Sequence, residues 1–138
     1  MRGSRLKQIA VFAAVVMAAT TGVATVAAEL AQQTSRDRGV TVRVKPVDVS
    51  AGAKAWTFEV VLETHSQDLS DELVRVATLN GIGRAPQRPT GWQGDPPGGH
   101  HRKGVLRFAP ITPAPLAVEL RIQRPGESAP RTFQWSLK

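Results

Sequence analysis

Residues 56–63 read Trp-Thr-Phe-Glu-Val-Val-Leu-Glu, and this stretch decides the fold. Its large apolar side chains, Trp56, Phe58, Val60 and Leu62, occupy every second position. A β-strand places successive side chains on opposite faces, so an apolar period of two predicts a half-buried strand with its aromatic residues toward a core. We therefore expect a β-rich domain built around this strand.

Similar alternation recurs on both sides of this strand. The segments that show it are residues 40–45, 105–108, 116–123 and 132–137. Glycine- and proline-containing turns separate them, which gives about six or seven short strands in a domain of about 100 residues. This pattern favours an all-β fold, a small antiparallel β-sandwich with immunoglobulin-like architecture. A small β-barrel is the alternative.

Two connections depart from the strand pattern. Residues 69–73 could form one helical turn, whereas the β-branched residues that follow favour a strand over residues 74–78. Residues 80–103 are so rich in glycine and proline that they exclude a helix and leave at most a short strand around Trp92. Long irregular loops of this kind are often functional.

The N-terminus indicates export. The first seven residues carry three basic side chains, and residues 9–28 are uncharged and mostly alanine and valine. Small residues at 26–28 precede Glu29, as a signal peptidase requires, so the segment is typical of a cleaved signal peptide. About twenty apolar residues would also suffice for an uncleaved membrane anchor. Both alternatives place the remaining chain outside the cytoplasm, either periplasmic or secreted, or anchored to the membrane by residues 9–28.

These observations divide the chain into a signal peptide or membrane anchor (1–28), a polar tether (29–38) and a β-sandwich domain (39–138). Removing the three N-terminal basic residues from the eighteen in the chain leaves fifteen against eleven acidic residues, a net charge of +4. The basic residues are dispersed rather than gathered with aromatic residues, so we expect no nucleic-acid partner. A mild preference for anionic partners follows from the net charge. The chain has no cysteine, so the domain must fold without a disulfide.

Two polar loops carry the candidate site. Residues 64–70 read Thr-His-Ser-Gln-Asp-Leu-Ser, and residues 92–104 read Trp-Gln-Gly-Asp-Pro-Pro-Gly-Gly-His-His-Arg-Lys-Gly. A glycine-proline loop has little apolar surface with which to order itself, so we expect hydrogen bonds to hold the two loops together at one end of the sandwich. The candidate residues for this loop network, or for binding a partner, are His65, Ser66, Asp68, Trp92, His100, His101 and Arg102. Trp92 is either a plug over the sandwich or an exposed anchor for a partner.

The histidines also suggest a metal site. Imidazole nitrogen and carboxylate oxygen are ligands for zinc or copper, and the candidates are His65, Asp68, His100 and His101, with Asp71 as a further carboxylate. Both methionines lie within residues 1–28 and there is no cysteine, which leaves no soft ligand for Cu(I) in the domain. Adjacent histidines point in different directions on extended backbone. A network that pins the loops is therefore the favoured interpretation, and zinc or Cu(II) binding is the alternative.

An enzyme is not expected. His65, Ser66 and Asp68 contain the atoms of a hydrolytic triad, but neighbours along a chain seldom adopt triad geometry. The sequence also lacks a Gly-x-Ser-x-Gly nucleophile elbow. We therefore expect a non-enzymatic exported binding, interaction or accessory module of the cell envelope, and a periplasmic or extracellular metal-binding protein as the alternative.

From about residue 40 to residue 138 the chain resembles a family of uncharacterised small bacterial exported or membrane-anchored proteins. The two quoted motifs carry the resemblance, and the longer one is the more specific. Members of that family commonly have aspartate where this chain has Glu63, and a tyrosine between the motifs, whereas this chain has no tyrosine. The resemblance implies an exported or anchored domain and no established activity.

Overall fold

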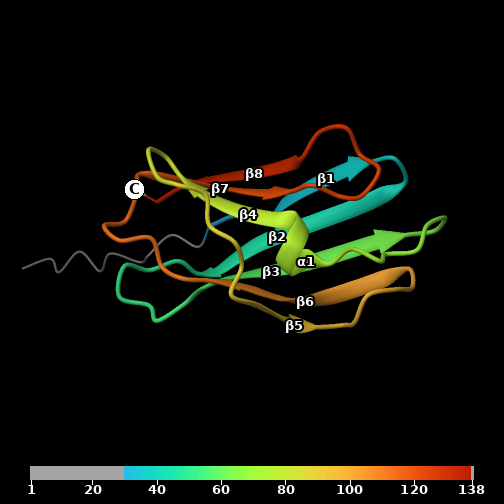
Figure 1. Ribbon diagram of the computed structural model, residues 1–138, viewed down its shortest axis with the longest axis horizontal. Helices are drawn as coiled ribbons and strands as arrows, with labels where there is room; N and C mark the ends of the chain where they lie inside the picture. The colour runs from blue at the N-terminus through green and yellow to red at the C-terminus, as the bar shows by residue number, and fades with distance from the viewer. Residues whose placement is uncertain (1–29, 138) are drawn as a thin grey trace, which may run out of the picture.

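The computed structural model describes residues 30–137, so the expected signal peptide or anchor (1–28) lies outside the described residues. The described chain is a two-layer antiparallel β-sandwich, which confirms the predicted fold class (Figure 1). Within residues 30–137, no helix has both the length and the apolar character needed to cross a membrane.

The sandwich consists of a five-stranded and a three-stranded sheet. The first has the order β1 (Gln33–Asp37), β2 (Val40–Asp48), β3 (Trp56–Thr64), β6 (His101–Phe108) and β5 (Gly91–Gly94). The second has the order β4 (Ala77–Gly81), β7 (Ala117–Ile122) and β8 (Arg131–Ser136), and a single helical turn, α1 (Leu73–Val76), precedes β4. All neighbouring strands in these sheets are antiparallel.

The core follows from the period-two pattern of β3. Trp56, Phe58 and Leu62 are fully buried, as their spacing predicted. The ring of Phe58 meets the edge of Phe108 at a centroid distance of 5.7 Å and lies 5.6 Å from the ring of Trp135 on the opposite sheet. Aromatic contacts therefore join the two layers.

The stretch predicted to be a polar tether, residues 29–38, instead contains strand β1, so the folded domain begins before Gly39. Polar contacts with β8 hold this strand. The side-chain amide of Gln33 donates to the carbonyl oxygen of Gln134 and accepts from its N–H at 3.1 Å. Trp135 Nε1 donates to the carbonyl oxygen of Ala31 at 2.7 Å. Because β1 is polar and has no apolar alternation, its sequence does not indicate a strand.

Two further boundaries differ from expectation. The helical turn lies at Leu73–Val76 rather than at 69–73, and strand β4 begins at Ala77 rather than at 74. The turn forms where Arg75 and Val76 both donate their backbone N–H to the carbonyl oxygen of Glu72, at 2.8 and 3.0 Å. Around Trp92, where the sequence allowed at most a short strand, the structure has β5.

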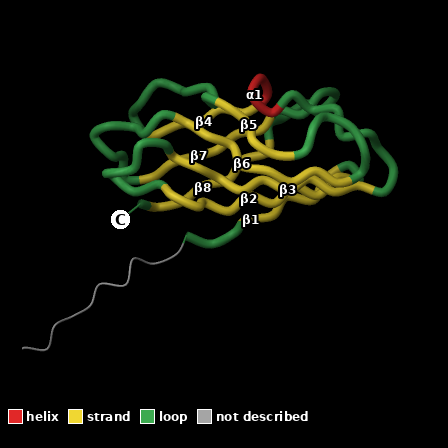
Figure 2. The backbone as a smooth tube through the Cα atoms, turned by 90° about the horizontal axis from the view of Figure 1, so that it is seen from below, coloured by secondary structure: helices red, strands yellow, loops and turns green. Residues whose placement is uncertain are grey.

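The connections gather at the two ends of the sandwich (Figure 2). We call one the histidine end; it consists of the turn 38–39 and the loops 65–72, 95–100 and 123–130. We call the other the entry end; it consists of residues 30–32, the loops 49–55, 82–86 and 109–116, and Leu137. In Figure 1 the histidine end lies on the right and the entry end on the left, beside the C-terminus.

Candidate functional site at the histidine end

The two polar loops lie against each other, as the sequence predicted. Leu69 donates its N–H to the carbonyl oxygen of Gly99 at 2.9 Å and accepts from the N–H of Gly98 at 2.8 Å, and Thr64 N–H donates to the carbonyl oxygen of His100 at 3.0 Å. Gly98 and Gly99 have φ angles of 114° and 74°, which residues with a Cβ rarely adopt. The two glycines therefore allow the loop to turn back along residues 64–69.

The buried side chain of Arg102 donates hydrogen bonds to both loops. It continues the inward face of β6 and is 1% exposed. Its NH1 donates to the carbonyl oxygens of Leu69 at 3.2 Å and Asp71 at 2.6 Å, and its NH2 donates to the carbonyl oxygen of Asp95 at 3.3 Å. One buried guanidinium thus satisfies carbonyl groups that belong to both loops.

Trp92 lies over strand β6, next to Arg102. Its half-buried ring packs on Gly104, where an added Cβ would lie only 2.6 Å from the ring. The Arg102 guanidinium lies 5.6 Å from the ring centre, within the range of a cation–π interaction. Trp92 Nε1 also donates to the carbonyl oxygen of Asp95 at 2.9 Å. The indole therefore covers Arg102 and supports the start of the loop.

The acidic and imidazole side chains behave differently from each other. Asp68 Oδ1 accepts from the N–H of Gly99 at 2.8 Å, so Asp68 pins the glycine loop. The imidazoles of His65 and His100 are exposed and make no hydrogen bond to another described residue; the carbonyl oxygen of His100 alone joins the network. Ser66 is exposed, and its N–H donates to Thr64 Oγ1 at 3.2 Å.

His101 lies beside a carboxylate on the outer face of the five-stranded sheet. Its Nε2 is 3.7 Å from Glu63 Oε1. A hydrogen bond from Arg43, followed by the charge of the same guanidinium, lowers the pKa of Glu63. Across residues 30–137, no three or more side chains of His, Cys, Asp or Glu lie where they could hold one metal ion.

A buried charged network, which sequence analysis missed, underlies the same end. The Asp71 carboxylate accepts two hydrogen bonds from Arg124, from Nε at 2.8 Å and from NH2 at 3.1 Å. Glu127 accepts from NH1 of Arg124 at 3.2 Å and from Nε and NH2 of Arg131 at 2.9 and 2.8 Å. The side chains of all four residues are at most 5% exposed. Each buried charge of this network is therefore paired, where apolar packing ends.

The network reaches the first strand. Arg131 donates to the carbonyl oxygens of Val40 and Asp37, both at 2.8 Å, and of Ser35 at 3.3 Å. Since Asp71 also accepts from Arg102 through its backbone carbonyl oxygen, hydrogen bonds run continuously from β6 to the turn between β1 and β2. The four connections of the histidine end are thereby tied to one another.

The pKa values reflect this pairing. Burial alone would raise the pKa of Glu127, but hydrogen bonds and charge from Arg131, followed by those of Arg124, lower it from its ordinary value of 4.5. Burial alone would likewise lower the pKa of Arg124, but the hydrogen bond and charge of Asp71 raise it. Glu127 is therefore ionised at neutral pH.

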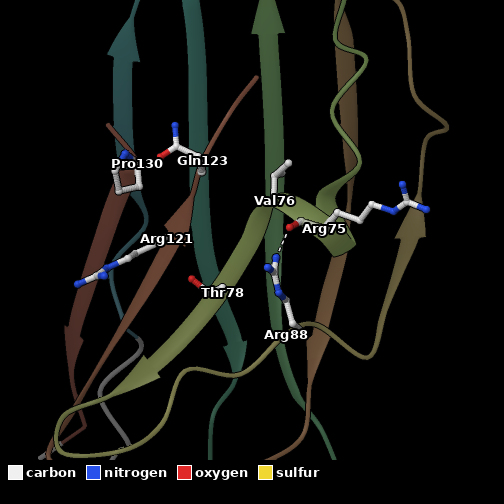
Figure 3. A pocket seen from close by; sticks show the side chains of 7 residues that line it. All are labelled: Arg75, Val76, Thr78, Arg88, Arg121, Gln123 and Pro130. Carbon is white, nitrogen blue, oxygen red and sulfur yellow. Dashed lines mark hydrogen bonds between the residues drawn. The ribbon is translucent and has the colours of Figure 1, made fainter. Parts of the chain in front are cut away.

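A separate hollow of about 370 Å³ lies on the outer side of the three-stranded sheet (Figure 3). Arg75, Arg88 and Arg121 line it, but their side chains point in different directions. Arg88 donates to the carbonyl oxygen of Arg75, and Arg121 pairs with Glu119. The guanidinium groups therefore do not converge on a common point where an anion could bind.

A scan against protein-family models and searches of curated proteins and of solved structures found no match to this chain.

Proposed function

We propose that this protein is a non-enzymatic, extracytoplasmic binding module of the cell envelope, and that its histidine end engages a protein partner. One observation carries the proposal. Buried hydrogen bonds from Arg102 and an exposed one to Asp68 hold the backbone of the histidine end, while the side chains of His65, His100, Pro96 and Pro97 on that backbone are exposed. A surface ordered before binding loses less conformational entropy when a partner arrives.

The desolvation cost of the buried charged residues at the histidine end supports the proposal. Burying arginines and carboxylates requires desolvation that well-packed apolar side chains would avoid. Arg102, Asp71, Arg124 and Arg131 all lie at the histidine end, whereas the middle of the sandwich is apolar. A costly polar interior at one end is consistent with a requirement for a defined loop geometry there.

The order of the strands adds a fold-level analogy. Strands β2-β3-β6-β5 and β4-β7-β8 follow the order A-B-E-D and C-F-G of an immunoglobulin constant-type sandwich, with β1 added at one edge. We therefore propose an immunoglobulin-like architecture. In this correspondence the histidine end carries the B–C and F–G loops, which form a binding surface in variable domains. The analogy supports the location of the surface and does not identify the partner.

Site-specific photo-crosslinking in the native cell envelope tests the proposal. A photoreactive residue at Pro97 or His100 should give a discrete crosslinked product with a protein. Thr132, exposed on the outer face of β8, is the matched control and should give none. Equal labelling from Thr132, or no product from Pro97 and His100, would contradict a partner at the histidine end.

The alternative function, zinc or Cu(II) binding through His65, Asp68, His100 and His101, is separated by metal titration. Under the proposed function neither ion changes the melting temperature. A rise in melting temperature that His65→Ala and His101→Ala abolish would instead favour the metal-binding protein, because a ligand that binds only the folded state stabilises it.

A further inference from the structure

Exposed apolar side chains are concentrated at the entry end. Among the described residues, the large hydrophobic side chains that remain exposed are Val47 (62%), Val74 (36%), Ile82 (69%) and Leu116 (63%). Single exposed apolar residues are common on protein surfaces. Three of these four, however, lie at the same end of the sandwich: Val47 near the end of β2, Ile82 directly after β4, and Leu116 directly before β7.

Backbone hydrogen bonds order the chain at two of these residues, Ile82 and Leu116. Ile82 donates its N–H to the carbonyl oxygen of Ala117 at 3.2 Å, and the carbonyl oxygen of Leu116 accepts from the N–H of Leu137 at 2.8 Å. Leu116 and Ile82 therefore flank β7 at the entry end. The exposed side chains of these two residues therefore project from hydrogen-bonded backbone.

The N-terminal hydrophobic segment joins the fold at this end with little slack. Leu30 packs against the core, and the next carbonyl oxygen, that of Ala31, accepts from Trp135. The uncharged stretch ends at residue 28, two residues before Leu30. Two extended residues span about 7 Å, so an anchored chain would hold the entry end close to the membrane surface.

Strand β1 is responsible for this placement. Without it the chain would enter at Val40, which lies at the histidine end. β1 runs antiparallel to β2 and so carries the chain to the opposite end of the sandwich. The fold thus separates the apolar entry end from the polar histidine end by the length of the strands (Figure 1).

The charges at the entry end suit lipid headgroups. Lys54 and Arg84 are exposed in its loops. Asp48 is the acidic residue in this part of the described chain, and hydrogen bonds from the backbone and side chain of Ser50 occupy its Oδ1. Lysine and arginine can place their apolar stems along a membrane interface while their charged groups remain in water. Exposed aliphatic side chains flanked by basic residues are typical of surfaces that lie on a bilayer.

We propose that the entry end, through Val47, Ile82 and Leu116, rests on the bilayer into which an uncleaved N-terminal segment is anchored. The histidine end then faces away from that membrane. This inference concerns a different surface from the proposed partner site, and it requires the anchor rather than the cleaved signal peptide.

The absence of cysteine from the chain allows a clean test. Ile82→Cys and Leu116→Cys, each labelled with an environment-sensitive fluorophore, are compared with Val74→Cys, an exposed apolar position away from the entry end. The full-length chain is reconstituted into vesicles of phosphatidylcholine and phosphatidylglycerol that contain no other protein. Labels at 82 and 116 should shift to shorter emission wavelength, and aqueous iodide should quench them several-fold less than the label at 74.

Labels at 82 and 116 that are as accessible to iodide as the label at 74 would overturn the inference. Because the vesicles contain no other protein, only the bilayer can shield the labels. A contact between the entry end and another membrane protein would therefore leave them accessible to iodide. Failure here would leave the crosslinking test at the histidine end unaffected. Conversely, shielded labels with no crosslinked product at Pro97 or His100 would retain the membrane contact and reject the partner surface.

Discussion

At the scale of single residues, an arginine stands where the inward faces of three strands, β6, β7 and β8, reach the histidine end. Arg102 begins the inward row of β6, Arg131 begins that of β8, and Arg124 follows that of β7. All three are nearly fully buried. Each guanidinium has several donors in a fixed planar arrangement, so it can satisfy loop carbonyls that apolar side chains would leave unpaired.

Replacing Arg102 should therefore weaken the fold. Arg102→Met leaves the carbonyl oxygens of Leu69, Asp71 and Asp95 without this donor, and the free energy of unfolding should fall by about 3 kcal/mol, since one stranded partner costs about 1–3 kcal/mol. Arg107→Met, at an exposed position of the same strand, should change it by less than about 0.5 kcal/mol. Urea unfolding of both variants measures the difference, and equal midpoints would disprove the role of Arg102.

Substitutions of Asp68 and His100 should differ in their effect on the free energy of unfolding. Asp68→Ala removes the acceptor of the Gly99 N–H and should lower the free energy of unfolding by about 1 kcal/mol. His100→Ala should be nearly neutral, because the exposed imidazole makes no hydrogen bond to a described residue. Thermal unfolding distinguishes them. A loss from His100→Ala as large as that from Asp68→Ala would mean that the imidazole also holds the loop.

At the scale of elements, the short strand β5 depends on two facing glycines. Gly94 and Gly104 are paired in the register of β5 and β6. A Cβ on Gly94 would lie 2.4 Å from the Cα of Gly104, and a Cβ on Gly104 would meet the Trp92 ring. The absence of side chains lets the Trp92 ring approach Gly104 closely, and this contact joins β5 to the loop network.

Gly104→Ala should displace the indole and destabilise the domain by about 1–3 kcal/mol, the usual cost of overpacking. Gly91→Ala is the matched control in β5, because nothing lies within 4 Å of its added Cβ. Melting temperature and tryptophan fluorescence should change for the first variant and remain near the parent for the second. A Gly104→Ala protein that melts with the parent would show that Trp92 can shift without loss.

At the scale of the whole molecule, the charged network joins elements that the sheets alone do not connect. Arg131 links β8 to the β1–β2 turn, and Arg124 links the β7–β8 loop to Asp71 between β3 and α1. The lowered pKa of Glu127 makes this connection sensitive to acid. A depressed carboxylate pKa stabilises the fold above the ordinary value, and the stabilisation is lost as the pH falls through the folded-state pKa.

Glu127→Gln should therefore lower the free energy of unfolding by about 2 kcal/mol at pH 7, the value of hydrogen bonds to a charged group. The gap from the parent should begin to narrow as the pH falls below 4.5, where the unfolded chain binds the proton first, and should close once the pH falls through the lowered folded-state pKa of Glu127. Glu72→Gln, at an exposed carboxylate outside the network, should follow the parent throughout. A gap that persists unchanged at pH 3 would contradict an ionic contribution from Glu127.

The sequence by itself determined the β-strands and their core side chains, because alternation in β2, β3, β7 and β8 assigns each side chain to a face without knowledge of its neighbours. It also predicted that the two polar loops meet, since a glycine-proline loop needs external hydrogen bonds. Only the tertiary structure decided which groups supply them. Arg102 and Asp68 do so, whereas the imidazoles of His65 and His100 stay in solvent.

The inward rows already place Arg102, Arg124 and Arg131 among buried positions, so their spacing could have indicated buried arginines. The carboxylates that pair with them, and the polar strand β1, could not be found in the same way. Asp71 and Arg124 lie 53 residues apart, and Gln33 and Gln134 lie 101 residues apart. Partners at such separations are set by how the two sheets pack. Local periodicity carries no information on this packing.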